Sequence, residues 1–313
     1  MKINKRGELT TQQIVILIVL VISFIVILYF LFRLNLGAES EKEICHNSVI
    51  LRGNVLLSEK TVPLNCKRTY VCLSKDGSCE SMTNPNIEKA SSKEEVYRIL
   101  AEEMADCWWM FGEGKIDYIG DKTKEANYCS ICSQIAFDNS IRKIEGFESG
   151  EINKDEFYNY LSETSLSEGK QTYAEYFFGT KNIASLVSEI SVSEGNEEGI
   201  STFGKIHLDE NYFVMMGITS QIGNKYKWIG GVAVVVGILT LPFTAVGGAI
   251  ILVSGVVTGV VGDDLAEKLY NPKIVALIVE GEGIDNEFMA PTIIEASPEA
   301  FRLLNCKDIV TLS

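Results

Sequence analysis

The sequence has few residues of the kinds that most enzymes and nucleic-acid-binding proteins depend on. Only two of its 313 residues are histidine. It has no Gly-x-Ser-x-Gly turn, no His-Glu-x-x-His zinc helix, no phosphate-binding loop and no dinucleotide-binding glycine pattern. The formal net charge is −14, and no basic stripe is present beyond Lys2, Lys5 and Arg6. Nucleic acid requires clustered positive charge. We therefore predict no nucleic-acid partner, no catalytic residues, no cofactor and no metal ion, in a protein that is not an enzyme.

A long apolar run lies near the start of the chain. From Ile14 to Phe32 it is interrupted only by Ser23, which is about the length of a helix that crosses a bilayer core. Three cations precede the run and the acidic stretch "AESEKE" follows it. The positive-inside rule then keeps the N-terminus cytoplasmic and exports the rest. A cleaved secretory signal has a shorter apolar part, so residues 1–33 are predicted to be a retained anchor in the cell membrane.

The segment "KRGELTTQQIVIL" resembles the archaeal class III signal of type IV pilin-like proteins. In that family a membrane peptidase cuts just after the glycine and leaves the apolar helix on the mature protein. The resemblance implies a cut between Gly7 and Glu8 and a pilin-type signal peptidase as a partner. Glu8 stands where the family usually has Gln, and Gln12 stands where it usually has Glu. Because that Glu offsets a neighbour's charged amine in the membrane, the resemblance implies anchoring more directly than filament assembly.

All eight cysteines follow this first apolar run. They are Cys45, Cys66, Cys72, Cys79, Cys107, Cys129, Cys132 and Cys306. An even number of cysteines in an exported domain is typical of a disulfide framework. The sequence alone does not determine which cysteines pair.

The spacing Cys129-x-x-Cys132 allows two other interpretations. It could be the dithiol of an exported thiol oxidoreductase, or half of a zinc site completed by other cysteines. A redox centre favours a helix N-terminus, whereas "SQIAFD" after Cys132 alternates like a strand. Export makes structural disulfides the favoured interpretation.

Residues 45–227 are predicted to form an exported α+β domain, preceded by an acidic linker over 34–44. Short strands are expected at "SVILRGNVLL", "RTYVCLS", "GKIHL" and "YFVMMGITSQ". The clearest helix begins at a capping box of Ser92 and Glu95 and ends at Gly112.

Two motifs in this domain suggest binding sites, but each has a simpler interpretation. In "CWWMF", helical spacing sends Cys107, Trp108 and Phe111 into the core and leaves Trp109 off that face. The stretch "EGFESGEINKDEFYNYL" imitates a calcium loop, but its third ligand position would be a phenylalanine, which cannot bind calcium. We predict instead a helix capped by Asn153.

Residues 228–262 form a second apolar segment that contains no charged residue. Its length exceeds one bilayer-spanning helix, and Pro242 lies near its middle. Together with many glycines, this predicts a Gly-rich apolar helical hairpin, embedded in the membrane or else buried in protein or in an oligomer interface. Residues 263–313 are expected to add a final strand and a short helix that pack back on the exported domain.

These features together predict a membrane-anchored archaeal cell-surface protein with a structural or interaction role, as a pilin-like or envelope component. Its partners would be the lipid bilayer and either other copies of the chain or an envelope protein. Two alternatives stay open. One is a membrane-perturbing protein that inserts the 228–262 hairpin, and the other is an exported thiol oxidoreductase that uses Cys129 and Cys132.

Overall fold

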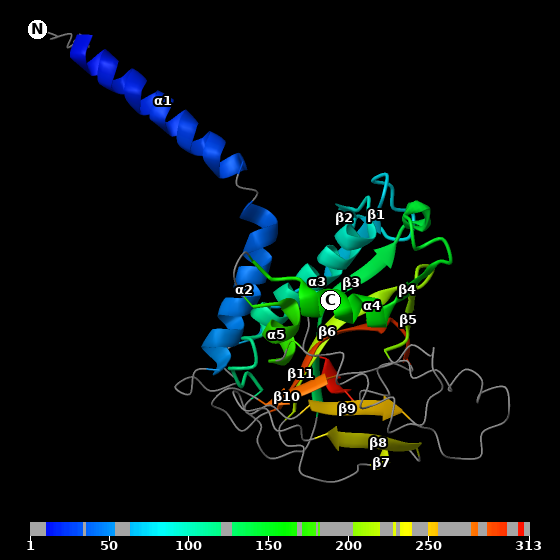
Figure 1. The fold of residues 1–313 in the computed structure, drawn as a ribbon. Coiled ribbons are helices and arrows are strands. Elements are labelled where there is room, and N and C mark those ends of the chain that lie inside the picture. The colour runs from blue at the N-terminus through cyan, green and yellow to red at the C-terminus, as the bar shows by residue number, and fades with distance from the viewer. Residues whose placement is uncertain are drawn as a thin grey trace, which may run out of the picture. The chain divides into compact units, whose positions relative to one another are not determined.

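The computed structural model describes most of the chain in segments (Figure 1). These are residues 11–33, 36–53, 63–119, 127–167, 171–179, 181, 203–219, 228–229, 232–239, 250–255, 277–280, 287–298 and 306–309. The chain divides into two compact units, Met1–Glu43 and Ile44–Ser313. Each unit is described by itself below.

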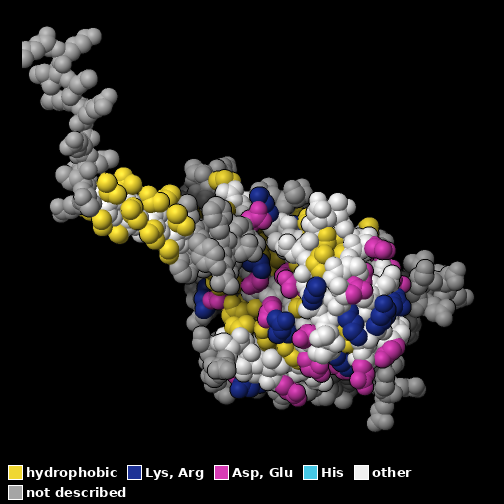
Figure 2. All heavy atoms as spheres, turned by 90° about the horizontal axis from the view of Figure 1, so that it is seen from above, with side chains coloured by type: hydrophobic (Ala, Val, Ile, Leu, Met, Phe, Trp, Pro, Cys, Tyr) yellow, Lys and Arg dark blue, Asp and Glu magenta, His cyan; other side chains and the backbone are white. Residues whose placement is uncertain are grey.

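The first unit contains helix α1 (Thr11–Arg33) and the beginning of helix α2 (Leu36–Gly53). The side chains of α1 are described from Ile14 to Val26, where all are exposed. This stretch is covered by hydrophobic side chains, whereas acidic and basic side chains are interspersed over the visible face of the second unit (Figure 2). Over the described part of the chain, no helix combines the length and apolar character that crossing a membrane requires. The stretch 34–44, expected to be a linker, lies largely within α2.

Among the described residues of the second unit, a mixed sheet has ten strands, and five of them follow one another at one end of it. They are β1 (Thr69–Ser74), β2 (Asn86–Lys89), β3 (Asn127–Phe137), β6 (Tyr212–Thr219) and β11 (Glu287–Glu295), in the order β2-β1-β3-β6-β11. β1 runs parallel to both neighbours, whereas β6 is antiparallel to β3 and β11. Strand β12 (Cys306–Ile309) pairs in parallel with the first residues of β3, and β1 pairs with its last residues. The predicted α+β class is confirmed.

Helices pack against one face of this sheet (Figure 1). Helix α3 (Lys93–Met110) contacts β3, β6 and β11, and α4 (Lys154–Glu163) and α5 (Tyr173–Phe178) contact α3. The 3-10 helix η1 (Asn139–Lys143) follows β3, and β4 (Glu151–Asn153) pairs with β5 (Lys205–His207). Leu100 and Phe111 belong to the main hydrophobic core, as do the sheet residues Ile135 and Val214.

The predicted helix ends are confirmed where the structure describes them. The Ser92 side chain accepts a hydrogen bond from the backbone N–H of Glu95, and α3 ends at a Phe111 cap followed by Gly112, whose φ is +83°. The Glu95 carboxylate bonds Ser91 rather than Ser92, so the capping box is only half formed. Asn153 caps α4 as predicted. Trp108 is buried, whereas Trp109 is half-buried and stacks on His46 with ring centroids 4.1 Å apart.

The helical prediction for residues 228–262 is wrong over the part that the structure describes. This part forms β7 (Trp228–Ile229), β8 (Val232–Leu239) and β9 (Ile250–Gly255). β8 and β9 are antiparallel, and β10 (Leu277–Glu280) joins β9 to β11, so the ladder of the sheet continues through them. Strands β8 and β9 are both rich in valine and isoleucine, whose branched Cβ favours strands. A short apolar run alone does not distinguish a buried strand from a helix.

The strand expected at "SVILRGNVLL" is also wrong for its first half, because residues 48–53 belong to α2. Ser48 and Val49 are buried on this helix, whereas Ile50 and Leu51 are exposed. The second half of that stretch lies outside the described residues.

Candidate functional site

The Cys-x-x-Cys pair lies on β3 and is divided between two disulfides. Cys107 on α3 bonds Cys132, and Cys306 on β12 bonds Cys129, with Cα–Cα distances of 5.5 Å in both bridges. Residues three apart on a strand point to opposite faces of the sheet. Cys132 accordingly belongs to the main core under the helices, and Cys129 belongs to a second core with Met215 and Met289.

The pairing of β3 with β6 contains a β-bulge at Cys132. The pairing of β3 with β6 shifts between Ile131 and Ser133, which leaves Cys132 as the extra residue. Cys132 lies on the α3 side of the sheet and bonds Cys107, while Ile131 belongs to the second core. A dithiol redox centre needs two cysteines that can bond each other. The geometry of β3 does not provide that arrangement.

The other two disulfides fix the segments before and after β1. Cys45 on α2 bonds Cys66, and Cys72 on β1 bonds Cys79 in the following loop. All eight cysteines are therefore paired, and the predicted disulfide framework is confirmed. Disulfides form and persist in oxidising compartments. Four of them indicate an extracytoplasmic environment for this domain.

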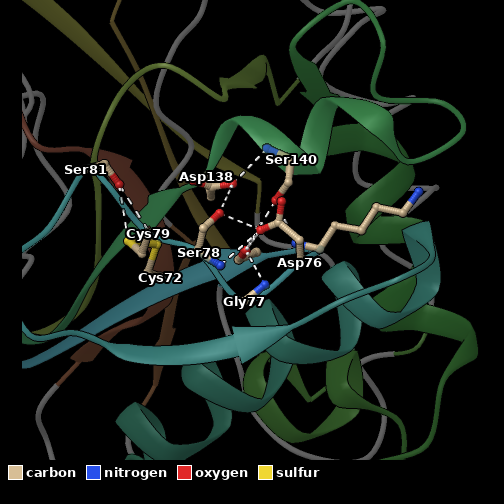
Figure 3. Close-up of a disulfide and its surroundings, with 10 residues drawn as sticks. Cys72, Asp76, Gly77, Ser78, Cys79, Ser81, Asp138 and Ser140 are labelled. Carbon is tan, nitrogen blue, oxygen red and sulfur yellow. Dashed lines mark hydrogen bonds between the residues drawn. A yellow bond between two sulfur atoms is a disulfide. The ribbon is translucent and has the colours of Figure 1, made fainter.

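A cluster of serine and aspartate side chains surrounds the Cys72–Cys79 loop (Figure 3). The Asp76 carboxylate accepts hydrogen bonds from the Ser78 backbone N–H at 3.0 Å and from its hydroxyl at 2.5 Å. The same Ser78 hydroxyl lies 3.2 Å from Asp138, which also accepts from the Ser140 N–H at 2.8 Å. The cluster thus joins the loop after β1 to the start of η1.

The electrostatics of this cluster favour ionised carboxylates. Hydrogen bonds from Ser78 lower the pKa of Asp76 to about 2. Burial raises the pKa of Asp138, but hydrogen bonds from Ser140 and Ser78 together hold the pKa below its ordinary value. Within the described segments, no group of three or more His, Cys, Asp or Glu residues could hold a metal ion. The hydrogen bonds of the cluster are those of a loop-closing network.

A buried lysine is the most unusual titratable group of the second unit. Lys154, at the first turn of α4, is 7% exposed, and its Nζ donates to the backbone carbonyl of Ile293 on β11 at 2.9 Å. Burial lowers the pKa of this amine to about 8, and the negative charge of Glu295 acts in the opposite direction. Sequence reasoning missed this residue, because a lysine in the first turn of a helix usually lies in water.

Two buried serines on β3 differ in their hydrogen bonding. Ser130 and Ser133 are both fully buried. The Ser130 hydroxyl lies 3.2 Å from the Tyr118 hydroxyl, whereas the Ser133 hydroxyl has no hydrogen-bond partner among the residues that the structure describes.

We expect Ser133→Ala to raise the free energy of unfolding by about 1 kcal/mol, because it removes an unsatisfied buried hydroxyl. The matched change Ser130→Ala should instead lower it by about 1–3 kcal/mol, because the Tyr118 hydroxyl would lose its partner. Urea unfolding of both variants measures the difference. Destabilisation by Ser133→Ala would contradict this account of the core.

No protein-family description, no curated protein and no solved structure matches this chain. The predicted processing residues Gly7 and Glu8 lie outside the described residues. The resemblance to pilin-like signals therefore stays a prediction.

Proposed function

We propose that this chain is a membrane-anchored cell-surface protein of the archaeal pilin-like kind. Its N-terminal helix would hold it in the membrane, and its disulfide-linked α+β domain would act outside the cell in a structural or interaction role. The observation that carries this proposal is the set of four disulfides, which requires an oxidising compartment. An exported domain reaches that compartment behind a membrane-targeting segment, and the apolar run before α2 is of that kind.

Helix α1 supports the anchoring part of the proposal. Its backbone is helical over 23 residues, and the apolar run continues to Phe32. The side chains of α1 are described only as far as Val26. A spanning helix takes about 20 apolar residues, which the whole run supplies. The exposure of all side chains described in α1 is what a lipid-facing helix needs.

The short N-terminal segment supports processing by a pilin-type peptidase. A cut after Gly7 would leave Glu8 as the first residue, separated by a short, mostly polar stretch from the apolar run that begins at Ile14. Gln12 can hydrogen-bond but carries no charge, so any association of neighbouring helices would lack a charged contact at this position. The proposal therefore concerns an anchored protein that acts with a partner or with other copies, rather than an obligatory filament.

We expect the full chain to stay in the membrane fraction of cells washed with alkaline carbonate, with its N-terminus at Glu8 by mass spectrometry. The double variant Leu20→Arg with Phe24→Arg should be released, because each charge at the centre of a spanning helix costs about 2.5–3.5 kcal/mol. Leu20→Ala with Phe24→Ala is the matched control and should remain bound. Release of the unchanged chain, or retention of the arginine variant, would contradict the anchor.

A further inference from the structure

Three polar side chains, Arg68, Tyr70 and Gln134, lie on the face of the sheet opposite to the helices without a polar partner among the described residues. Strands β1, β3 and β6 lie side by side here (Figure 1), and Tyr70 pairs with Gln134, which in turn pairs with Phe213. Directly paired residues point to the same face of a sheet. Phe213 belongs to the second core, so the row Tyr70–Gln134–Phe213 faces away from α3. The Arg68 guanidinium lies over the Phe213 ring, 5.2 Å from its centroid.

Arg68, Tyr70 and Gln134 have no hydrogen-bond or ion-pair partner within the described part of the chain. Arg68 forms no hydrogen bond or ion pair there, and its Nε is buried without an acceptor. Gln134 is half-buried and Tyr70 is 42% exposed, and neither the Gln134 amide nor the Tyr70 hydroxyl forms a hydrogen bond with another described residue. This is unusual in a chain with 42 acidic and 28 basic residues, where carboxylates are abundant. An unsatisfied, partly desolvated guanidinium is unfavourable and calls for an explanation.

The chemistry of these groups fits a carboxylate. Arginine presents a planar set of donors that matches a carboxylate, and stacking on an aromatic ring holds the guanidinium plane in place. The Gln134 amide and the Tyr70 hydroxyl add neutral donors on the same face. From these observations we propose that Arg68, Gln134 and Tyr70 bind the side-chain carboxylate of an acidic residue on a partner protein.

The surroundings of the row favour a protein over a sugar acid. Ile87 on β2 pairs with Cys72, which follows Tyr70 on the same face of β1, and Ile87 is 43% exposed. Exposed aliphatic and tyrosine side chains beside an arginine are what protein interfaces bury. A sugar would place hydroxyl groups against Ile87. This inference rests on the interaction role proposed above, and it adds that the partner is a protein that presents an acidic side chain.

Arginine-selective modification of the full chain in detergent tests the site. The chain is treated with phenylglyoxal, and the rates at Arg68 and Arg98 are followed by peptide mass spectrometry. Arg98 is the internal control, because it is exposed and ion-paired with Glu102. N-acetylglutamate amide should slow modification at Arg68 several-fold but not at Arg98, and the neutral N-acetylglutamine amide should have no effect. Equal protection by both compounds, or no protection, would overturn the proposal. Glucuronate that protects as well as N-acetylglutamate amide would overturn the assignment to a protein partner.

Variants test the same site by fluorescence polarisation with a labelled peptide of alternating glutamate and serine. Arg68→Met keeps an apolar group over Phe213 and should weaken binding about tenfold or more. Tyr70→Phe removes only a hydroxyl and should weaken it about threefold, which keeps the test decisive if Arg68→Met folds poorly. Arg98→Met should bind like the unchanged chain. Unchanged affinity in both site variants would refute the site, whereas failure of the anchor would appear only in the carbonate experiment.

Discussion

Loss of the Cys129–Cys306 disulfide, by changing both cysteines to alanine, should lower the free energy of unfolding by about 5 kcal/mol. This bridge joins residues 177 positions apart, the longest separation of the four. A cross-link over a long loop removes more conformational freedom from the unfolded chain than one over a short loop. Alanine is the suitable replacement because Cys129 is fully buried, where a serine hydroxyl would lack a partner.

The Cys72–Cys79 pair supplies the comparison, because its separation is only 7 residues. The corresponding double alanine variant should lose about 2.5 kcal/mol on the same chain-entropy argument. Guanidinium unfolding of both variants at one pH measures the two losses. An equal loss in the two variants, or a larger one for the short loop, would show that strain or residual structure outweighs loop length here.

The second large effect concerns the buried amine of Lys154 and changes with pH. Its pKa in the folded protein is about 8, against 10.5 for an ordinary lysine. Below pH 8 the amine is charged in both folded and unfolded states, and burial of this charge destabilises the fold by about 3 kcal/mol. As pH rises from 8 to 10.5 the folded state releases its proton first. The unfolded state then binds more protons, so stability from this group rises with pH.

Lys154→Met should therefore be more stable than the unchanged chain at pH 7, and this advantage should shrink by about 2 kcal/mol by pH 9.5. Measurements should stop there, because burial also raises the pKa of Tyr158 to about 12, which destabilises the fold above pH 10. Lys205→Met is the matched control, since Lys205 is an exposed lysine paired with Glu151. A constant difference between Lys154→Met and the unchanged chain from pH 7 to 9.5 would refute the depressed pKa.

Local rules of the sequence were sufficient for the helices α3 and α4. Caps such as Ser92 and Asn153 act through backbone groups a few residues away, so the sequence contains the whole signal. The core positions of α3 follow from the 3.6-residue period of a helix. Trp108 falls on the core side of this period and is buried, whereas Trp109 falls off it and is half-buried. Strands β1, β5 and β6 were likewise visible as alternating or β-branched runs.

Strand β11, near the centre of the sheet, could not be predicted in this way. It contains Pro291, which lacks an N–H and normally argues against a central strand. The pairing of β11 with β6 shifts between Met289 and Thr292, so the proline lies at a bulge where no ladder bond is required. Strands β8 and β9 were mistaken for helices because only their pairing partners, distant in sequence, identify them.

The candidate sites were predictable only in part. Eight cysteines after an apolar run indicate disulfides, but the partners of Cys129 and Cys132 depend on which elements pack on the two faces of β3, and Cys306 is 177 residues from Cys129. The strand-like alternation after Cys132 was the one local signal against a redox pair. Lys154 and Arg68 had no signal at all, because the burial of Lys154 and the lack of a polar partner for Arg68 among the described residues follow from the fold.

Disulfide mapping of the protein from its native membrane, trapped with an alkylating reagent before lysis and digested without reduction, tests the central claim most directly. An exported, disulfide-stapled domain predicts no alkylated cysteine and linked peptides for Cys107–Cys132 and Cys129–Cys306. Alkylated Cys129 and Cys132, or a bond between these two residues, would contradict both the framework and the oxidising compartment inferred from it.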